Sequence, residues 1–113
     1  MQLLPAELRA EIPKLYSQEK ITTQEKMVYA KFFFPAADWT WFVTEGEDEG
    51  DDFVFFGFVK GFEEEWGYFT LNELQNINIQ LLTVERDLHF KPGKFADVIA
   101  RFRKERGLIS PSI

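Results

Sequence analysis

The stretch WTWFVTEGEDEGDDFVFFGFVKG, residues 39–61, decides the fold. Both of its ends are rich in aromatic and β-branched residues, which favour β-strands. Its middle holds two glycines and a run of acids, a composition that is typical of a turn. We therefore expect two antiparallel strands, residues 39–45 and 53–60, joined by a hairpin with an acidic tip.

Further strand-like runs flank this hairpin. Residues 27–34 form the first of them, which Pro35 closes, and residues 64–69 follow a turn that Gly61 permits. Residues 79–84 are either a further short strand or an extended connection. The expected sheet is an antiparallel meander of about four strands.

Three helices complete the expected fold. An apolar stripe predicts an N-terminal helix over residues 4–16, in which Pro13 removes a backbone donor and ends or kinks the helix. Thr70 and Glu73 form a capping box that opens a short helix. An apolar stripe with basic residues at its end predicts a longer helix over residues 94–106. The pattern indicates an α+β protein with its helices packed on one face of the meander.

Both faces of the sheet are expected to be apolar. Trp39, Trp41 and Val43 share one face of their strand, and apolar residues occupy odd and even positions alike in residues 53–59. Two explanations are open for this pattern. Either helices cover both sides of the sheet, or one face is a binding surface.

Composition limits the class of protein. The chain has 113 residues, of which 45% are hydrophobic, so it is expected to form a single domain over residues 1–113 with its own core. It has no cysteine, which excludes disulfides, thiolate nucleophiles and cysteine-bound zinc. No signal-peptide pattern opens it, and no apolar run approaches the ~20 residues of a membrane span. A soluble, cytoplasmic protein is therefore expected.

Four strings of the sequence together resemble a bacterial family called domain of unknown function 2958. They are LYSQE at 15–19, KFFFPAADWTWFVTEGE at 31–47, FFGFVKGFEEEWGYFTLNEL at 55–74 and ERDLHF at 85–90. The resemblance runs from Leu3 to about Val98. It implies carriage by plasmids and other mobile elements, and work related to DNA or to defence. It brings no activity, cofactor or catalytic residue with it.

Six carboxylates within eight residues dominate the charge pattern of the chain, whose net charge is −6. Like charges at this density repel one another, and the repulsion costs stability. Three interpretations of the segment are open. It is a surface that binds a basic protein partner, a site for a divalent cation, or a solvated turn that discourages pairing at the sheet edge. The EF-hand spacing is absent, and no metal site is predicted. The six are Glu45, Glu47, Asp48, Glu49, Asp51 and Asp52.

The tryptophans Trp39, Trp41 and Trp66 have two interpretations. In the first they anchor a protein partner or stack on nucleic-acid bases. In the second they belong to the core, which their alternation beside many phenylalanines favours.

Residues 85–89 form the only segment that resembles an active site. His89 is the sole histidine, and Asp87 or Glu85 would orient it as a general base if the segment is extended. The sequence places no nucleophile beside His89. The competing interpretation is structural: Arg86 pairs with a carboxylate and fixes the chain before the last helix.

Basic residues of the last helix offer a nucleic-acid-binding face through Arg101, Arg103 and Lys104. An amphipathic surface helix explains these residues equally well. The net charge of the chain also opposes binding to a polyanion.

These observations favour a non-enzymatic binding module that meets a protein with a basic surface through the acidic tip, Trp39 and Trp41. An accessory nucleic-acid-binding domain is the first alternative. A small hydrolase centred on His89 is the second. No cofactor and no membrane partner are expected, and the sequence does not predict the oligomeric state.

Overall fold

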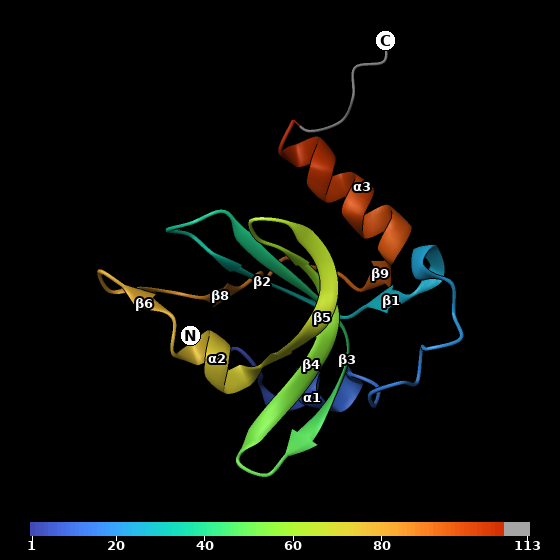
Figure 1. The fold of residues 1–113 in the computed structure, drawn as a ribbon, viewed down its shortest axis with the longest axis horizontal. Coiled ribbons are helices and arrows are strands. Elements are labelled where there is room, and N and C mark those ends of the chain that lie inside the picture. Colours follow the sequence, from blue (N-terminus) through green and yellow to red (C-terminus); the bar gives the residue numbers. More distant parts are fainter. Residues whose placement is uncertain (108–113) are drawn as a thin grey trace.

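A five-stranded antiparallel sheet forms the centre of the computed structural model, which describes residues 1–107 (Figure 1). Its strands lie in the order β5, β4, β3, β2, β8, so four consecutive strands form a meander. The fifth strand returns from the C-terminal half of the chain and pairs with β2. The α+β fold expected from the sequence is confirmed. The strands are β2 (Ala30–Phe34), β3 (Trp39–Glu49), β4 (Asp52–Lys60), β5 (Glu64–Thr70) and β8 (Glu85–Arg86).

The other elements are short. Two further pairs of strands lie outside the main sheet, one joining β1 to β9 and the other joining β6 to β7. The run over 27–34 is thus divided between two sheets, and the run over 79–84 contributes to a small hairpin. These elements are α1 (Ala6–Glu11), a 3-10 turn η1 (Thr23–Glu25), β1 (Met27–Val28), α2 (Leu71–Gln75), β6 (Asn78–Ile79), β7 (Leu82–Thr83), β9 (Gly93–Lys94) and α3 (Phe95–Glu105).

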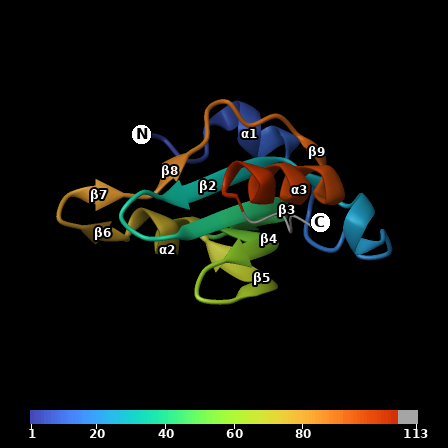
Figure 2. The same cartoon turned by 90° about the horizontal axis from the view of Figure 1, so that it is seen from above.

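Helices cover both faces of the sheet, which corrects the expectation that they pack on one face. The segment around α1 and the helix α2 pack on one side through Ile12 and Leu74, whereas α3 packs on the other through Phe102. The views along two axes place α3 away from α2 (Figures 1 and 2). The structure therefore favours the first of the two explanations for a sheet that is apolar on both faces.

Two separate cores result from this arrangement. Phe32, Trp41 and Phe55 belong to the first core, on the α1 and α2 side. Phe42 and Phe58 belong to the second core, on the α3 side. Each buried aromatic side chain removes about 150–250 Å² from water, so these rings dominate the packing energy on both faces.

The predicted helix boundaries are partly confirmed. The N-terminal helix ends at Glu11 because Ile12, which precedes Pro13, is extended (φ −73°, ψ 121°). At α2 the Thr70 hydroxyl accepts the N–H of Glu73 at 3.1 Å, as the capping-box pattern predicts. The last helix, expected over residues 94–106, spans Phe95–Glu105 and ends before Gly107. Residues 108–113 of the single domain expected over 1–113 lie outside the described part of the chain.

A β-bulge at Thr44 determines which face of the sheet the side chains in the second half of β3 point to. Val43 pairs with Gly57, and Glu45 pairs with Phe56, so Thr44 is an extra residue in β3. Strict alternation would place Glu45 on the same face as Val43, in the first core. The bulge turns Glu45 to the opposite face instead, beside Phe56.

Candidate functional site

The acidic segment is not the freely exposed tip that the sequence suggested. The strand expected to end at Glu45 continues to Glu49, and the turn itself consists of Gly50 and Asp51. Among residues 1–107, only Glu49 and Asp51 of the six carboxylates have neither an ion pair nor a side-chain hydrogen bond. In the folded chain, N–H groups and one arginine from the N-terminal region, together with an N–H group of α2, bind the other four carboxylates.

Glu45 is the most deeply engaged of these carboxylates. Glu45 is only 4% exposed. One of its carboxylate oxygens accepts the backbone N–H of Tyr16 and the other accepts that of Gln18, both at 2.8 Å. Gln18 is itself buried, and its amide donates to the carbonyls of Met27 and Thr44. Glu45 and Gln18 together anchor the loop that follows α1 to the sheet.

Two more carboxylates brace the same end of the hairpin. Glu47 accepts the N–H of Leu15 at 3.2 Å, and Asp48 forms an ion pair with Arg9 of α1. Both contacts join the hairpin to the first sixteen residues of the chain. They leave less negative charge available to an outside partner than the sequence suggests.

Asp52 connects the hairpin to α2. Its Oδ1 accepts the N–H of Phe53 at 2.8 Å and that of Asn72 at 3.0 Å. Burial acts to raise the pKa of Asp52, but the N–H donors of Asn72 and Phe53 outweigh it, and the pKa lies below its ordinary value of 3.8.

Trp39 and Trp41 lie at the opposite end of the hairpin from the acidic turn. β3 has 11 residues, so its two ends are separated by about 33 Å at the usual rise per residue. Trp41 is buried and Trp39 is partly buried. The acidic turn and the tryptophans therefore do not form the single binding surface that the sequence suggested.

An open apolar groove of about 420 Å³ lies at this tryptophan end. Phe62, in the turn between β4 and β5, is 95% exposed, and its ring meets that of Trp39 edge-on at a centroid distance of 5.4 Å. Trp41 lies behind Trp39 at 5.8 Å, and Leu74 and Ile79 line the groove from α2 and β6. We call this site the apolar groove.

The hairpin of β6 and β7 extends the apolar surface beyond the groove. It projects from the body of the molecule (Figure 2). Its turn residues Gln80 and Leu81 have φ values of 53° and 72°, a conformation that costs residues other than glycine about 1–3 kcal/mol each. The Asn78 side chain supports the turn by accepting the N–H of Leu81 at 3.1 Å. Leu81 is nevertheless 89% exposed.

Charged residues surround the groove end of the hairpin. Asp38 accepts a hydrogen bond from Lys60 at 2.8 Å and also pairs with Arg106 after α3. The Lys60 hydrogen bond is the main reason that the pKa of Asp38 lies below its ordinary value of 3.8; Arg106 adds to this, and burial opposes it. Asp38 thus ties the end of α3 to the sheet.

The three catalytic candidates do not share one extended face. β8 ends at Arg86, and the chain turns at Leu88 and His89, which breaks the alternation that the prediction required. Asp87 accepts the backbone N–H of His89 at 2.9 Å and lies 3.5 Å from the Lys31 amine. Its oxygens are therefore engaged with groups other than the imidazole.

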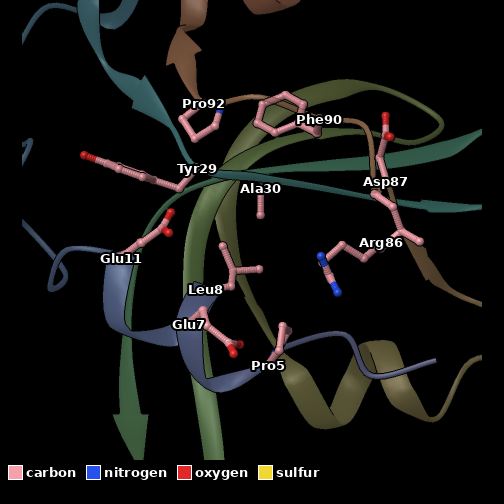
Figure 3. Close-up of a pocket in the computed structure, with 11 residues that line it drawn as sticks. Pro5, Glu7, Leu8, Glu11, Tyr29, Ala30, Arg86, Asp87, Phe90 and Pro92 are labelled. Carbon is pink, nitrogen blue, oxygen red and sulfur yellow. The ribbon is translucent and has the colours of Figure 1, made fainter.

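Arg86 lines an open cleft of about 390 Å³ between α1 and the sheet edge. Figure 3 shows its guanidinium reaching toward Leu8, while Asp87 points away. Its Nε is buried without a hydrogen-bond partner, and no carboxylate among residues 1–107 forms an ion pair with it. The expectation that Arg86 pairs with a carboxylate is therefore wrong, because Glu7 and Glu11 line the cleft without reaching it.

The basic residues of α3 have different surroundings. Arg103 pairs with Glu64 of β5 at 2.8 Å, which neutralises one of the three charges proposed to meet nucleic acid. Arg101 and Lys104 are exposed, and neither forms an ion pair within the described residues. These two residues alone leave a small basic area on the helix.

A second aromatic cluster lies on the α3 side of the sheet, near the loop that Glu45 anchors. The Tyr68 hydroxyl donates a hydrogen bond of 3.2 Å to that of Tyr16, and both rings are more than half exposed. This hydrogen bond is the main reason that the pKa of Tyr68 lies above its ordinary value of 10.0. Neither tyrosine was predicted from the sequence as a site residue.

The sequence contains weak signals for some of the surface residues that were not predicted. Phe62 follows Gly61 directly and precedes a run of glutamates. A large aromatic residue is thus surrounded by residues that are typical of a turn. Leu81 stands in a two-residue hairpin turn, where asparagine or glycine is usual. Tyr16 carried no local signal, because its position depends on the distant Glu45.

Residues 1–107 contain neither a cluster that could hold a metal ion nor a helix that could cross a membrane. No group of three or more histidine, aspartate or glutamate side chains is placed so that it could hold a metal ion. No helix in that range is long and apolar enough to cross a membrane.

Comparison with known proteins identifies one family. A family model described as a protein of unknown function (DUF2958) matches residues 3–110. No curated protein and no solved structure matches the chain.

Proposed function

The chain belongs to the DUF2958 family, whose description assigns no function, and we propose from its geometry that it is a module that binds a partner protein through the apolar groove. The partner contributes an apolar segment flanked by basic residues. The observation that carries the proposal is Phe62, a phenylalanine 95% exposed at the mouth of a groove that contains two tryptophans.

Exposed apolar side chains at this end are concentrated rather than scattered. Phe62, Ile79, Leu81 and Leu82 are all exposed, and the first two line the groove. Contiguous apolar surface of this kind on a small protein marks an interaction site more often than a single exposed leucine does. Burying a phenylalanine completely is worth about 1.5–3 kcal/mol, so Phe62 would be an effective anchor.

The strained turn of the β6–β7 hairpin supports the same assignment. Gln80 and Leu81 hold conformations that glycine or asparagine would adopt at lower cost. The strain presents Leu81 to solvent, where its 89% exposed side chain packs on little of the domain. Backbone strain that serves no packing purpose is typical of functional surfaces.

Charge indicates the chemistry of the partner. Glu73 lines the groove, Glu63 follows Phe62 in the turn, and Glu65 lies exposed at the start of β5. None of these three forms an ion pair within the part of the chain that the structure describes. An acidic rim around an apolar centre favours a partner with basic residues around an apolar anchor. We also propose that a mobile genetic element carries this protein, and this part of the proposal rests only on the family resemblance.

The test compares the tagged protein with the variants Phe62→Ser and Leu88→Ser in pull-downs from nuclease-treated lysate. Leu88 is a matched control, because it is also exposed but lies in the turn after β8, away from the groove. A partner that binds the wild type and L88S, and is lost from F62S, supports the proposal. A partner retained by F62S contradicts it. Circular dichroism spectra of both variants serve as the control for folding.

A further inference from the structure

We propose a second binding site, on the opposite face of the sheet from the apolar groove, that takes an organic cation of the alkylammonium type. Its walls are the rings of Tyr16, Phe56, Trp66 and Tyr68, and we call it the aromatic pocket. The cavity has a volume of about 350 Å³. This proposal does not depend on the function proposed for the groove.

The strand register assembles three of the four rings. Phe56 of β4 and Tyr68 of β5 are directly opposed in the antiparallel pair, and their ring centroids are 5.0 Å apart. Trp66 lies diagonally across, stacked on Phe56 at 5.9 Å. Since side chains at such positions share one face, the rings form a continuous aromatic wall.

Tyr16 completes the pocket from outside the sheet. Its φ of 71° is a left-handed conformation that is uncommon for a bulky residue. The Glu45 carboxylate holds it there by accepting its N–H at 2.8 Å, and its hydroxyl accepts the hydrogen bond from Tyr68. Tyr16 is thus fixed at the pocket although its ring remains 62% exposed.

Glu45 supplies a buried negative charge to the same pocket. The bulge at Thr44 turns its side chain to this face, beside Phe56. No lysine, arginine or histidine among residues 1–107 lies within ion-pair distance of it. Its oxygens are satisfied only by backbone N–H groups, so its charge is not neutralised by any side chain of the described chain.

The remaining charges at the pocket favour a cation as well. Glu19 adds a second carboxylate without an ion pair in the described range, and Lys26 is the single basic residue in the lining. The Lys26 amine is directed to the carbonyl of Gln18, to which it donates at 2.5 Å. The pocket therefore carries two negative groups against one positive group.

Aromatic faces beside carboxylates select a particular class of cation. The negative face of each ring attracts a positive charge, and the attraction is largest for tryptophan. An alkylammonium group carries apolar methyl or methylene groups that pack on the rings, and a quaternary ammonium is in addition weakly hydrated because it has no N–H. A lysine side chain of a protein and a free quaternary amine share this chemistry.

The test uses NMR titration of the ¹⁵N-labelled protein with choline chloride. The matched control ligand is 3,3-dimethylbutan-1-ol, the neutral isostere of choline, and sodium chloride corrects for ionic strength. The proposal predicts saturable shifts of the Trp66 indole N–H and the Tyr16 amide with choline, at least about fivefold tighter than with the neutral alcohol. Equal binding of the two, or no saturable shift with choline or with the lysine ligand described below, would overturn it.

Two variants locate the cation. Tyr68→Leu keeps an apolar side chain but removes the π face, and Glu19→Gln removes an exposed charge without disturbing the fold. Both are expected to weaken choline binding, Y68L by about fivefold. Phe62→Ala, on the other face, should bind choline like the wild type. Choline affinity unchanged in Y68L would contradict the proposal.

A parallel titration with N-acetyl-lysine methylamide distinguishes the two sources of the cation. Tighter binding of choline indicates a free quaternary amine, and tighter binding of the lysine derivative indicates a protein side chain. Either result supports a site for alkylammonium cations, provided that the same Trp66 and Tyr16 signals shift.

Discussion

The two ends of the β3–β4 hairpin differ in a way that the sequence conceals. The acidic end looks exposed in sequence, yet four of its six carboxylates hold the N-terminal region and α2 in place. The aromatic end looks like core, yet it leaves Phe62 almost fully exposed beside an open groove. The density of charge along a chain therefore says little about which charges remain available to a partner.

The largest effect is expected from Glu45→Ala at the acidic end. The substitution leaves the N–H groups of Tyr16 and Gln18 without acceptors, and each lost acceptor of this kind costs about 1–3 kcal/mol. We expect the free energy of unfolding to fall by roughly 2–4 kcal/mol in urea titrations. Glu49→Ala, four residues away, is the matched control and should change it by less than about 0.5 kcal/mol. Equal effects would mean that the acidic end is a uniform solvated turn.

At the aromatic end we expect a substitution that raises the free energy of unfolding. Leu81→Gly relieves the left-handed backbone of the turn and removes a side chain that packs on little. The variant should be more stable by about 1 kcal/mol in thermal or urea unfolding. The same variant should bind the partner of the groove more weakly. A loss of stability would show that Leu81 packs on the domain and is not a spare contact surface.

A smaller effect concerns the tyrosine pair that Glu45 positions. The raised pKa of Tyr68 means that the hydroxyl pair contributes stability below the ordinary tyrosine value of 10.0. This contribution is lost as the pH rises through the folded pKa. Absorbance titration at alkaline pH should show one tyrosine ionising above 10.0, and Tyr16→Phe should lower that pKa. An unchanged titration curve in Y16F would argue against the hydrogen bond between the two hydroxyls.

The smallest effect is expected from Asp38, beside the groove. Its lowered pKa means that its pairs with Lys60 and Arg106 add stability above pH 3.8 and lose it as the pH falls toward the folded pKa. Lys60→Met should raise the Asp38 pKa, as measured by carboxyl NMR titration. The stability change should be small because the pair is solvent-exposed. No change in the pKa would show that Arg106 alone determines it.

The sequence predicted the elements whose signals are local. The β3–β4 hairpin, the cap that the Thr70 hydroxyl gives to α2 and the apolar stripe of the last helix each depend on neighbouring residues, and the structure confirms these three. Element boundaries were less accurate, since β3 continues four residues beyond its expected end. The local signals indicated a short strand or an extended connection over residues 79–84, but not the hairpin that β6 and β7 form there.

The candidate sites depended on non-local events and were predicted less well. The bulge at Thr44 changes the face of Glu45 without changing the alternation that is visible in the sequence. β8 joins the sheet although its Arg86 pairs with Phe32, 54 positions earlier in the chain, and the chain turns at His89 soon after β8. Trp39 was predicted to bind a partner together with the acidic tip, and that role stays a prediction. It lines the apolar groove, whereas its neighbour Phe62 was recognised only in the folded chain.

The most direct test of the proposed function is site-specific photocrosslinking in cells. Benzoylphenylalanine would replace Phe62 at the aromatic end in one protein and Glu49 at the acidic end in another. Both positions are exposed, so the photoreactive group is equally accessible in the free domain. Binding through the apolar groove predicts a discrete protein adduct from position 62 and none from position 49. An adduct from position 49 alone would contradict it and return the binding surface to the acidic turn.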